Sequence, residues 1–90
     1  MDKQNSFKFL TAKVISITEH KNSSFTIEIK TKSFLFEEKD AVTVDPRCTF
    51  YKDDEIPKTI DIIKPGDNIK VTYIIHENIK IAFNINVMPK

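Results

Sequence analysis

The sequence predicts an all-β domain of five short strands. Its apolar residues are mainly Ile, Val and Phe, with seven Phe and no Trp, and β-branched and aromatic side chains favour strands. In several segments these residues alternate with polar ones at a period of two, which is typical of half-buried strands. No segment of helical length shows the helical period, so a helical fold is excluded.

The C-terminal part carries the clearest strand pattern. Apolar and polar residues alternate over residues 79–87, and a similar alternation covers residues 69–75. The segment 76–78 between them ends in Asn78, and Asn tolerates the left-handed backbone of a tight turn. The two runs predict an antiparallel hairpin. The residues of its second strand expected to face the core are Ile81, Phe83 and Ile85.

The N-terminal third predicts two more strands, joined by a polar turn over residues 19–23. Residues 7–18 form a long β-prone run whose apolar positions change parity around Val14 and Ile15. A bulge or a strong bend produces such a change and lets one strand serve two sides of a barrel. Residues 25–30 alternate regularly and predict the second strand.

The middle of the chain is less regular. A third strand is expected over residues 34–37, extending to residue 44, and Asp45 and Pro46 are expected to turn the chain there. Beyond that turn, residues 50–51 are candidates for a short strand. Residues 58–64 are candidates for one helical turn that closes a barrel end.

Pro65, Gly66 and Asp67 predict a tight turn before the last hairpin, because Pro fixes φ at one turn position and Gly supplies a positive φ at the next. Gly66 is the only glycine of the chain. Five short strands with a longer connection between the third and fourth match an OB-fold-like Greek-key barrel with at most one short helical turn. An SH3-like barrel is the alternative.

Three segments carry a resemblance to a known group of domains. They are TAKVISI at residues 11–17, DIIKPGDNIKVTY at 61–73 and KIAFNINV at 80–87. Together they resemble the strand and turn motifs of small bacterial OB-like β-barrel domains of unknown function, and the likeness extends over residues 11–87. The resemblance implies an exported, non-enzymatic module.

The same barrel pattern is similar to that of the periplasmic copper and silver metallochaperones of heavy-metal efflux systems. Their copper site is a cluster of Met, His and Trp on the barrel face. Here Trp is absent, and the two Met residues are Met1 and Met88, at opposite ends of the chain. Copper chaperoning is therefore not expected, and neither a metal nor another cofactor is predicted.

The length and charge of the chain limit the function classes. Its 90 residues predict a polar tail over residues 1–6 and a single domain over residues 7–88, expected to be a monomer. The net charge of +1 gives no electrostatic footprint for nucleic acid. No apolar run approaches the roughly 18–20 residues of a membrane span. A periplasmic or extracellular location is favoured if Met1 replaces a removed signal peptide, and a cytoplasmic one otherwise.

Two predicted turns hold the candidate binding residues. An OB-fold brings the loop between strands one and two near the loop between strands four and five. Those loops contain His20 with Lys21, and His76 with Glu77. We hypothesise a weak contact site there for an anion, a metal or a peptide, against the favoured interpretation that these are ordinary turn residues.

No arrangement of residues predicts catalysis. Cys48 lies 28 residues from either histidine and has no surrounding nucleophile signature, which favours a partly buried, inert thiol. The acidic run over residues 53–55 lacks calcium-loop spacing and is interpreted as a solvated turn. The chain is therefore predicted not to be an enzyme.

The sequence favours a non-catalytic binding or accessory module that acts through protein or small-ligand contacts. The alternative is a single-stranded nucleic-acid-binding OB domain, which would need exposed stacking aromatics beside basic side chains. The strand parity assigns four of the aromatic rings to the core, which speaks against stacking. The rings so assigned are Phe25, Phe34, Tyr73 and Phe83; for Phe50 and Tyr51 the parity gives no assignment.

Overall fold

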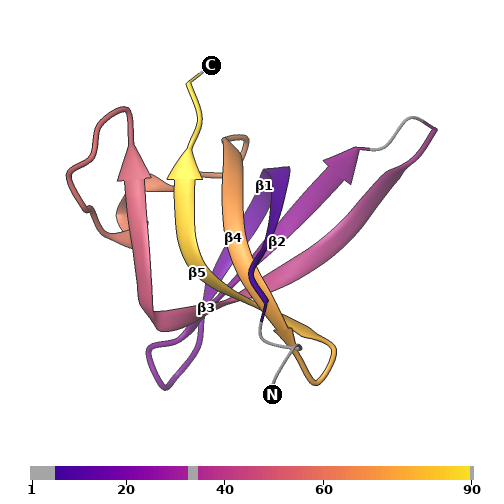
Figure 1. Ribbon diagram of the computed structural model, residues 1–90, viewed down its shortest axis with the longest axis horizontal. Coiled ribbons are helices and arrows are strands. Elements are labelled where there is room, and N and C mark those ends of the chain that lie inside the picture. Colours follow the sequence, from indigo (N-terminus) through magenta and orange to yellow (C-terminus); the bar gives the residue numbers. More distant parts are fainter. Residues whose placement is uncertain (1–5, 33–34, 90) are drawn as a thin grey trace.

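Five strands close into one barrel (Figure 1). The computed structural model describes residues 6–32 and 35–89, and for Lys32 the backbone alone. The strands are β1 (Lys8–Glu19), β2 (Phe25–Lys32), β3 (Glu37–Lys52), β4 (Asn68–His76) and β5 (Ile79–Val87). Their order around the barrel is β1-β2-β3-β5-β4, and only the β3–β5 pair is parallel. The predicted five-stranded, OB-fold-like barrel is confirmed.

A bulge in β1 allows this strand to pair with two neighbours. Val14 pairs with Ile29 of β2, but the next paired residue is Ser16, which leaves Ile15 without a partner in the ladder. The N-terminal half of β1 pairs with β4, and the C-terminal half pairs with β2. The parity change predicted around Val14 and Ile15 is therefore a real bulge.

The barrel interior is filled by small and β-branched side chains. Ile27, Ile29, Ile69 and Ile85 are fully buried, with Val42 and Val71 beside them. A short 3-10 helix, η1 (Ile60–Ile62), follows the long loop after β3, and Ile60 and Ile62 pack against this core. The single helical turn expected over residues 58–64 is confirmed. Among the described residues no helix is long and apolar enough to cross a membrane.

The predicted turn at Asp45 and Pro46 is wrong, because β3 continues through it. The register of β3 against β5 shifts between Val44 and Thr49, so the strand bends there and then goes on to Lys52. Asp45 stabilises the bend by accepting a hydrogen bond from the Arg47 backbone N–H at 2.8 Å. Side-chain capping of this kind is common in turns, but here the strand continues beyond it. Phe34, assigned to the core from sequence, lies outside the described residues.

The predicted parity of β5 is wrong in its first half. Thr72 pairs with Asn84 and Tyr73 pairs with Ala82, so Phe83 is an extra residue in β5. This bulge inverts the side chains before it: Ala82 is fully buried, whereas Ile81 and Phe83 are only half-buried. Beyond the bulge, Ile85 and Val87 point into the core as predicted.

Both turns predicted around β4 are confirmed. Gly66 has φ of 96°, and the Asp67 N–H donates to the Lys64 carbonyl at 3.0 Å, as a type II turn requires. The β4–β5 turn consists of Glu77 and Asn78, with φ of 53° and 67°. Positive φ at both positions is the geometry of the tight hairpin turns that match the twist of the strands.

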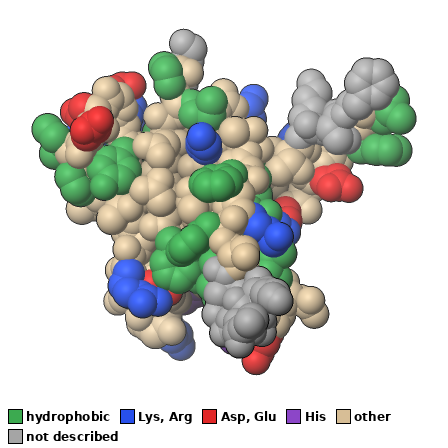
Figure 2. All heavy atoms as spheres, in the orientation of Figure 1, with side chains coloured by type: hydrophobic (Ala, Val, Ile, Leu, Met, Phe, Trp, Pro, Cys, Tyr) green, Lys and Arg blue, Asp and Glu red, His purple; other side chains and the backbone are tan. Residues whose placement is uncertain are grey.

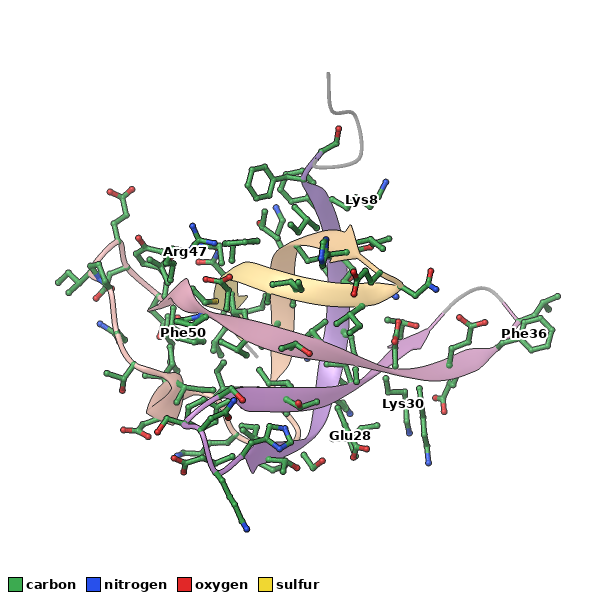
Figure 3. The ribbon with its side chains drawn as sticks, turned by 90° about the horizontal axis from the view of Figure 1, so that it is seen from below. Lys8, Glu28, Lys30, Phe36, Arg47 and Phe50 are labelled. Carbon is green, nitrogen blue, oxygen red and sulfur yellow. The ribbon has the colours of Figure 1, made fainter. Side chains whose placement is uncertain are left out.

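The β2–β3 hairpin projects beyond the barrel as an arm, formed by the paired residues 30–32 and 37–39 (Figure 1). In Figure 3, Lys30 lies along this arm and Phe36 lies at its far end. Leu35 and Phe36, near the tip, are 73% and 65% exposed. β2 and β1 pair no further than Lys30 and Lys13, so the arm diverges from β1 beyond that point.

Candidate functional site

The turns that hold the predicted site residues lie at the same end of the barrel (Figure 1). His20 and Lys21 follow β1. His76 is the last residue of β4, and Glu77 begins the turn that leads to β5. All four side chains are exposed.

Each histidine interacts within its own hairpin. The Nε2 atom of His20 lies 2.8 Å from the Thr26 hydroxyl, and the Nε2 atom of His76 lies 3.8 Å from a carboxylate oxygen of Glu77. No hydrogen bond or ion pair joins the two turns, and the described residues contain no group of three His, Cys, Asp or Glu side chains that could hold a metal ion. A metal or ligand site at this end stays a hypothesis from sequence.

Cys48 borders a hollow of about 380 Å³ at the bend of β3, which Phe25, Phe50 and Ile60 also line. The thiol is partly buried, as predicted. Burial, together with the nearby negative charge of Asp45, raises its pKa to about 12. A thiol protonated at neutral pH is a poor nucleophile, because the thiolate is the reactive form.

The acidic run over residues 53–55 is a solvated turn, as predicted. Asp54 accepts a hydrogen bond from the Ile56 backbone N–H at 3.1 Å and pairs with Lys58 at 3.3 Å. The pKa of Asp54 is lowered mainly by this hydrogen bond from the Ile56 backbone. Its carboxylate thus holds the loop between β3 and η1 in shape.

Three aromatic rings that the sequence did not assign to a surface site lie on the outside of the barrel: Phe7 just before β1, Phe9 in β1 and Phe83 in β5. Phe7 and Phe9 are 58% and 65% exposed. The ring of Phe7 meets the edge of the Phe83 ring, with centroids 5.8 Å apart and planes at 90°. This T-shaped arrangement is a favoured geometry of aromatic pairs. Figure 2 shows hydrophobic side chains beside basic ones over this part of the barrel.

Two cations lie over these rings. The Arg47 guanidinium carbon is 5.3 Å from the Phe83 centroid, and the Lys70 Nζ is 5.9 Å from the Phe9 centroid. Both distances are within the range of cation–π attraction. We name the set of Phe7, Phe9, Phe83, Arg47 and Lys70 the aromatic face.

Asp45 fixes the guanidinium of the aromatic face. Arg47 donates from Nε to one carboxylate oxygen of Asp45 at 3.0 Å and from a terminal nitrogen to the other at 3.3 Å. These hydrogen bonds are the main cause that lowers the pKa of Asp45. The forked contact holds the plane of the guanidinium in place beside the Phe83 ring.

Two features of sequence explain why the aromatic face was missed. Side chains alternate between the two faces of a strand, so Phe7 and Phe9 point to the face opposite Ala12 and Val14. If Ala12 and Val14 are in the core, both rings are on the outside. That signal was available. The outward position of Phe83 depends on a bulge that no residue pattern in β5 predicts.

A groove of about 390 Å³ adjoins this face where the arm diverges from β1. Thr11 and Lys13 line it on the β1 side, and Lys30 and Glu37 line it on the arm. Lys30 and Glu37 pair across the arm at 3.5 Å. The groove therefore mixes polar walls with apolar surface from Ala12, Met88 and Pro89. One of its cations, Lys13, makes no ion pair with the described residues.

The fold is similar to that of CusF from Escherichia coli. A structure of a tryptophan-to-alanine variant with Cu(II) aligns with a TM-score of 0.65 at 19% identity, over 99% of this chain and 100% of that one. A structure with Ag(I) aligns with a TM-score of 0.64 at 20% identity, over the same shares. The apo structure gives 0.63 at 20% identity, over 99% of this chain and 95% of that one. No protein-family model and no curated protein matches the chain.

Sequence identity of 19–20% shows a common fold and nothing about function, so the function of this chain is inferred from its own residues. The metals named for CusF belong to that protein. In this chain Met88 is exposed at the end of β5, and the sequence has no Trp. The aromatic face and the adjoining groove are therefore the candidate binding surface of this chain.

Proposed function

We propose that this protein is a non-catalytic binding module that contacts a protein partner through the aromatic face. The observation that carries the proposal is the exposure of Phe7 and Phe9, at 58% and 65%, together with the contact between Phe7 and the half-buried Phe83. Single exposed apolar residues are common on protein surfaces, whereas contiguous apolar patches with a polar rim are typical of interaction sites.

The composition of the aromatic face supports the same function. Aromatic residues and Arg are enriched at the centres of protein interfaces. Phe83 and Arg47 are already ordered by Phe7 and Asp45, so a partner that packs on them has less side-chain entropy to remove. Phe9, at 65%, is the most exposed of the three rings and therefore has the most apolar ring surface to bury.

Site-directed photo-cross-linking tests the proposal. A benzophenone amino acid replaces Phe9 in one variant and Phe36 in a matched control, whose ring is equally exposed at 65% but lies at the tip of the arm. We expect a discrete cross-linked protein in source cells from position 9 and none from position 36. An excess of unmodified protein should suppress the product, and an excess carrying Phe83→Ala should not.

The proposal fails if both positions give the same products. It also fails if unmodified protein does not compete. A product from position 36 alone would move the binding surface to the arm. Each variant is compared with the unmodified protein by thermal unfolding, so that a loss of fold is not taken for a loss of binding.

The second candidate function is binding of single-stranded nucleic acid. The outward position of Phe83 favours it, because the core assignment of this ring was a main argument against stacking. Bases stack on exposed rings while cations meet the phosphates. A labelled oligonucleotide whose retardation falls with added salt, and is lost in Lys70→Glu, would support this function. No retardation at low salt removes it.

A further inference from the structure

The N-terminal half of β1 has an open edge. Residues 8–13 pair with β4 on one side, but β2 reaches β1 only at Lys13. On the β2 side of residues 8–12, no strand of the described chain pairs with β1. Unpaired strand edges offer rows of hydrogen-bonding groups that another strand can use.

The hydrogen bonds of Val14 show which groups face this open edge. Val14 donates to the Asp67 carbonyl and accepts from the Gly66 N–H, both at 2.8 Å, so its backbone groups point to the β4 side. Because alternate residues of an antiparallel strand direct their groups to opposite sides, those of Phe9 and Thr11 point to the open side. Two N–H and two carbonyl groups are thus left for a strand beside β1.

The residues around the edge indicate which side chains an added strand should carry. Lys8 and Lys13 flank it, and Lys30 stands across the groove. The carboxylate on the groove wall, Glu37, is paired with Lys30. The exposed ring of Phe9 lies next to the position that an outward side chain of the added strand would take. An apolar residue there, with acidic residues towards Lys13, would complement this edge.

We propose that an extended acidic–apolar peptide of a protein partner binds by adding a strand to the open edge of β1, beside Phe9 and Thr11. This inference rests on the proposed function and gives its mode of contact. Main-chain hydrogen bonds to Phe9 and Thr11 hold the peptide, and alternate side chains meet the Phe9 ring and Lys13.

A second copy of this chain is a poorer occupant of the edge. Residues 8–13 contain two lysines and no acidic residue, so pairing of two copies would bring together four cations with no carboxylate between them. Lysine on an exposed edge is a common means of preventing such self-association. An acidic strand has the complementary charge.

A proline substitution tests the hydrogen bonds directly. Random octapeptides displayed on phage are selected on the unmodified protein, and the most enriched peptide is synthesised with a fluorescent label. Thr11→Pro removes an N–H that faces the open side, a position where an edge strand tolerates proline. Thr11→Val keeps the N–H and serves as the matched control. We expect Thr11→Pro to weaken peptide affinity roughly tenfold or more and Thr11→Val to leave it unchanged.

Amide exchange and stoichiometry complete the test. The Phe9 and Thr11 amides should exchange quickly in the free protein and become protected when the octapeptide binds, at a stoichiometry of one peptide per chain. Equal affinities of Thr11→Pro and Thr11→Val overturn strand addition, as do an unenriched library and a dimer formed without peptide. If Phe9→Ala weakens the peptide while Thr11→Pro does not, the aromatic face stands as the binding surface and the strand-addition mode alone fails.

Discussion

At the scale of single residues, Phe83 and Ile85 show how one bulge divides a strand between core and surface. Both were expected to face the core. Ile85 does so and is fully buried, whereas Phe83 lies outside between Phe7 and Arg47. A bulge reverses which face the side chains take on one side of it only. The residues beyond it, Ile85 and Val87, therefore face the core as predicted.

This division predicts different stability losses in β5. Ile85→Ala should lower the free energy of unfolding by about 2–5 kcal/mol, because it removes buried methylenes and leaves a cavity. Phe83→Ala should cost less, about 1–2 kcal/mol, since the ring is half-exposed and loses mainly its aromatic and cation–π contacts. Urea unfolding monitored by circular dichroism measures both. Similar losses, or a larger loss for Phe83→Ala, would place Phe83 in the core after all.

The buried thiol of Cys48 predicts a pH dependence. The pKa of the folded thiol is about 12, above its ordinary value of 9.0. The folded state therefore prefers the neutral thiol, and this preference contributes stability below pH 9 that is lost as the pH rises towards 12. The difference in unfolding free energy between the unmodified protein and Cys48→Ala should shift in favour of Cys48→Ala from about pH 8 to about pH 10.5. A difference that stays constant over this range would contradict the assigned burial of the thiol.

At the scale of elements, strand positions and the turn at Gly66 could be predicted from the sequence, because period-two alternation and turn residues are local signals. The bend of β3 could not. Asp45 and Pro46 are turn residues by composition, yet Thr49 and Phe50 re-enter the sheet beside β5. Pairing with a strand that lies far along the chain decides this, and no local pattern carries it.

Replacing Gly66 should lower the free energy of unfolding through backbone strain rather than through a steric clash. A Cβ at Gly66 would meet no heavy atom within 4 Å, but its φ of 96° disfavours any L side chain. Gly66→Val should destabilise by roughly 1–3 kcal/mol. Gly66→Asn should cost less, because Asn tolerates positive φ better. Thermal unfolding of the two variants decides: equal melting temperatures for unmodified protein and Gly66→Val would remove the turn assignment.

At the scale of the whole molecule, closing the barrel creates both the core and the candidate binding surface. The OB-like order of strands follows from five alternating segments and one long connection, which is why the fold could be predicted. The candidate site could not be predicted in the same way. The sequence pointed to His20 and His76, whose turns lie at one end of the barrel. The rings of the aromatic face instead come from β1, from the residue before it and from β5, and these segments meet only because β1 and β5 both pair with β4.

Closure also explains why the open edge of β1 is short. β1 is long enough to pair with β4 and then β2, so each of its halves has one side without a strand. In the first half that side adjoins Phe9 and the groove. The exposed rings and the unpaired backbone groups thus lie on the same segment of one strand.

Mapping the backbone amide resonances tests the central claim, that partners bind at the aromatic face, most directly. The protein captured by cross-linking from position 9 is purified and titrated into isotope-labelled chain, and the amide shifts are followed in two-dimensional NMR spectra. We predict that the largest changes lie in residues 7–13 of β1 and at Arg47, Lys70 and Phe83. Changes confined to the turns at His20 and His76, or to the arm around Leu35 and Phe36, would contradict the claim.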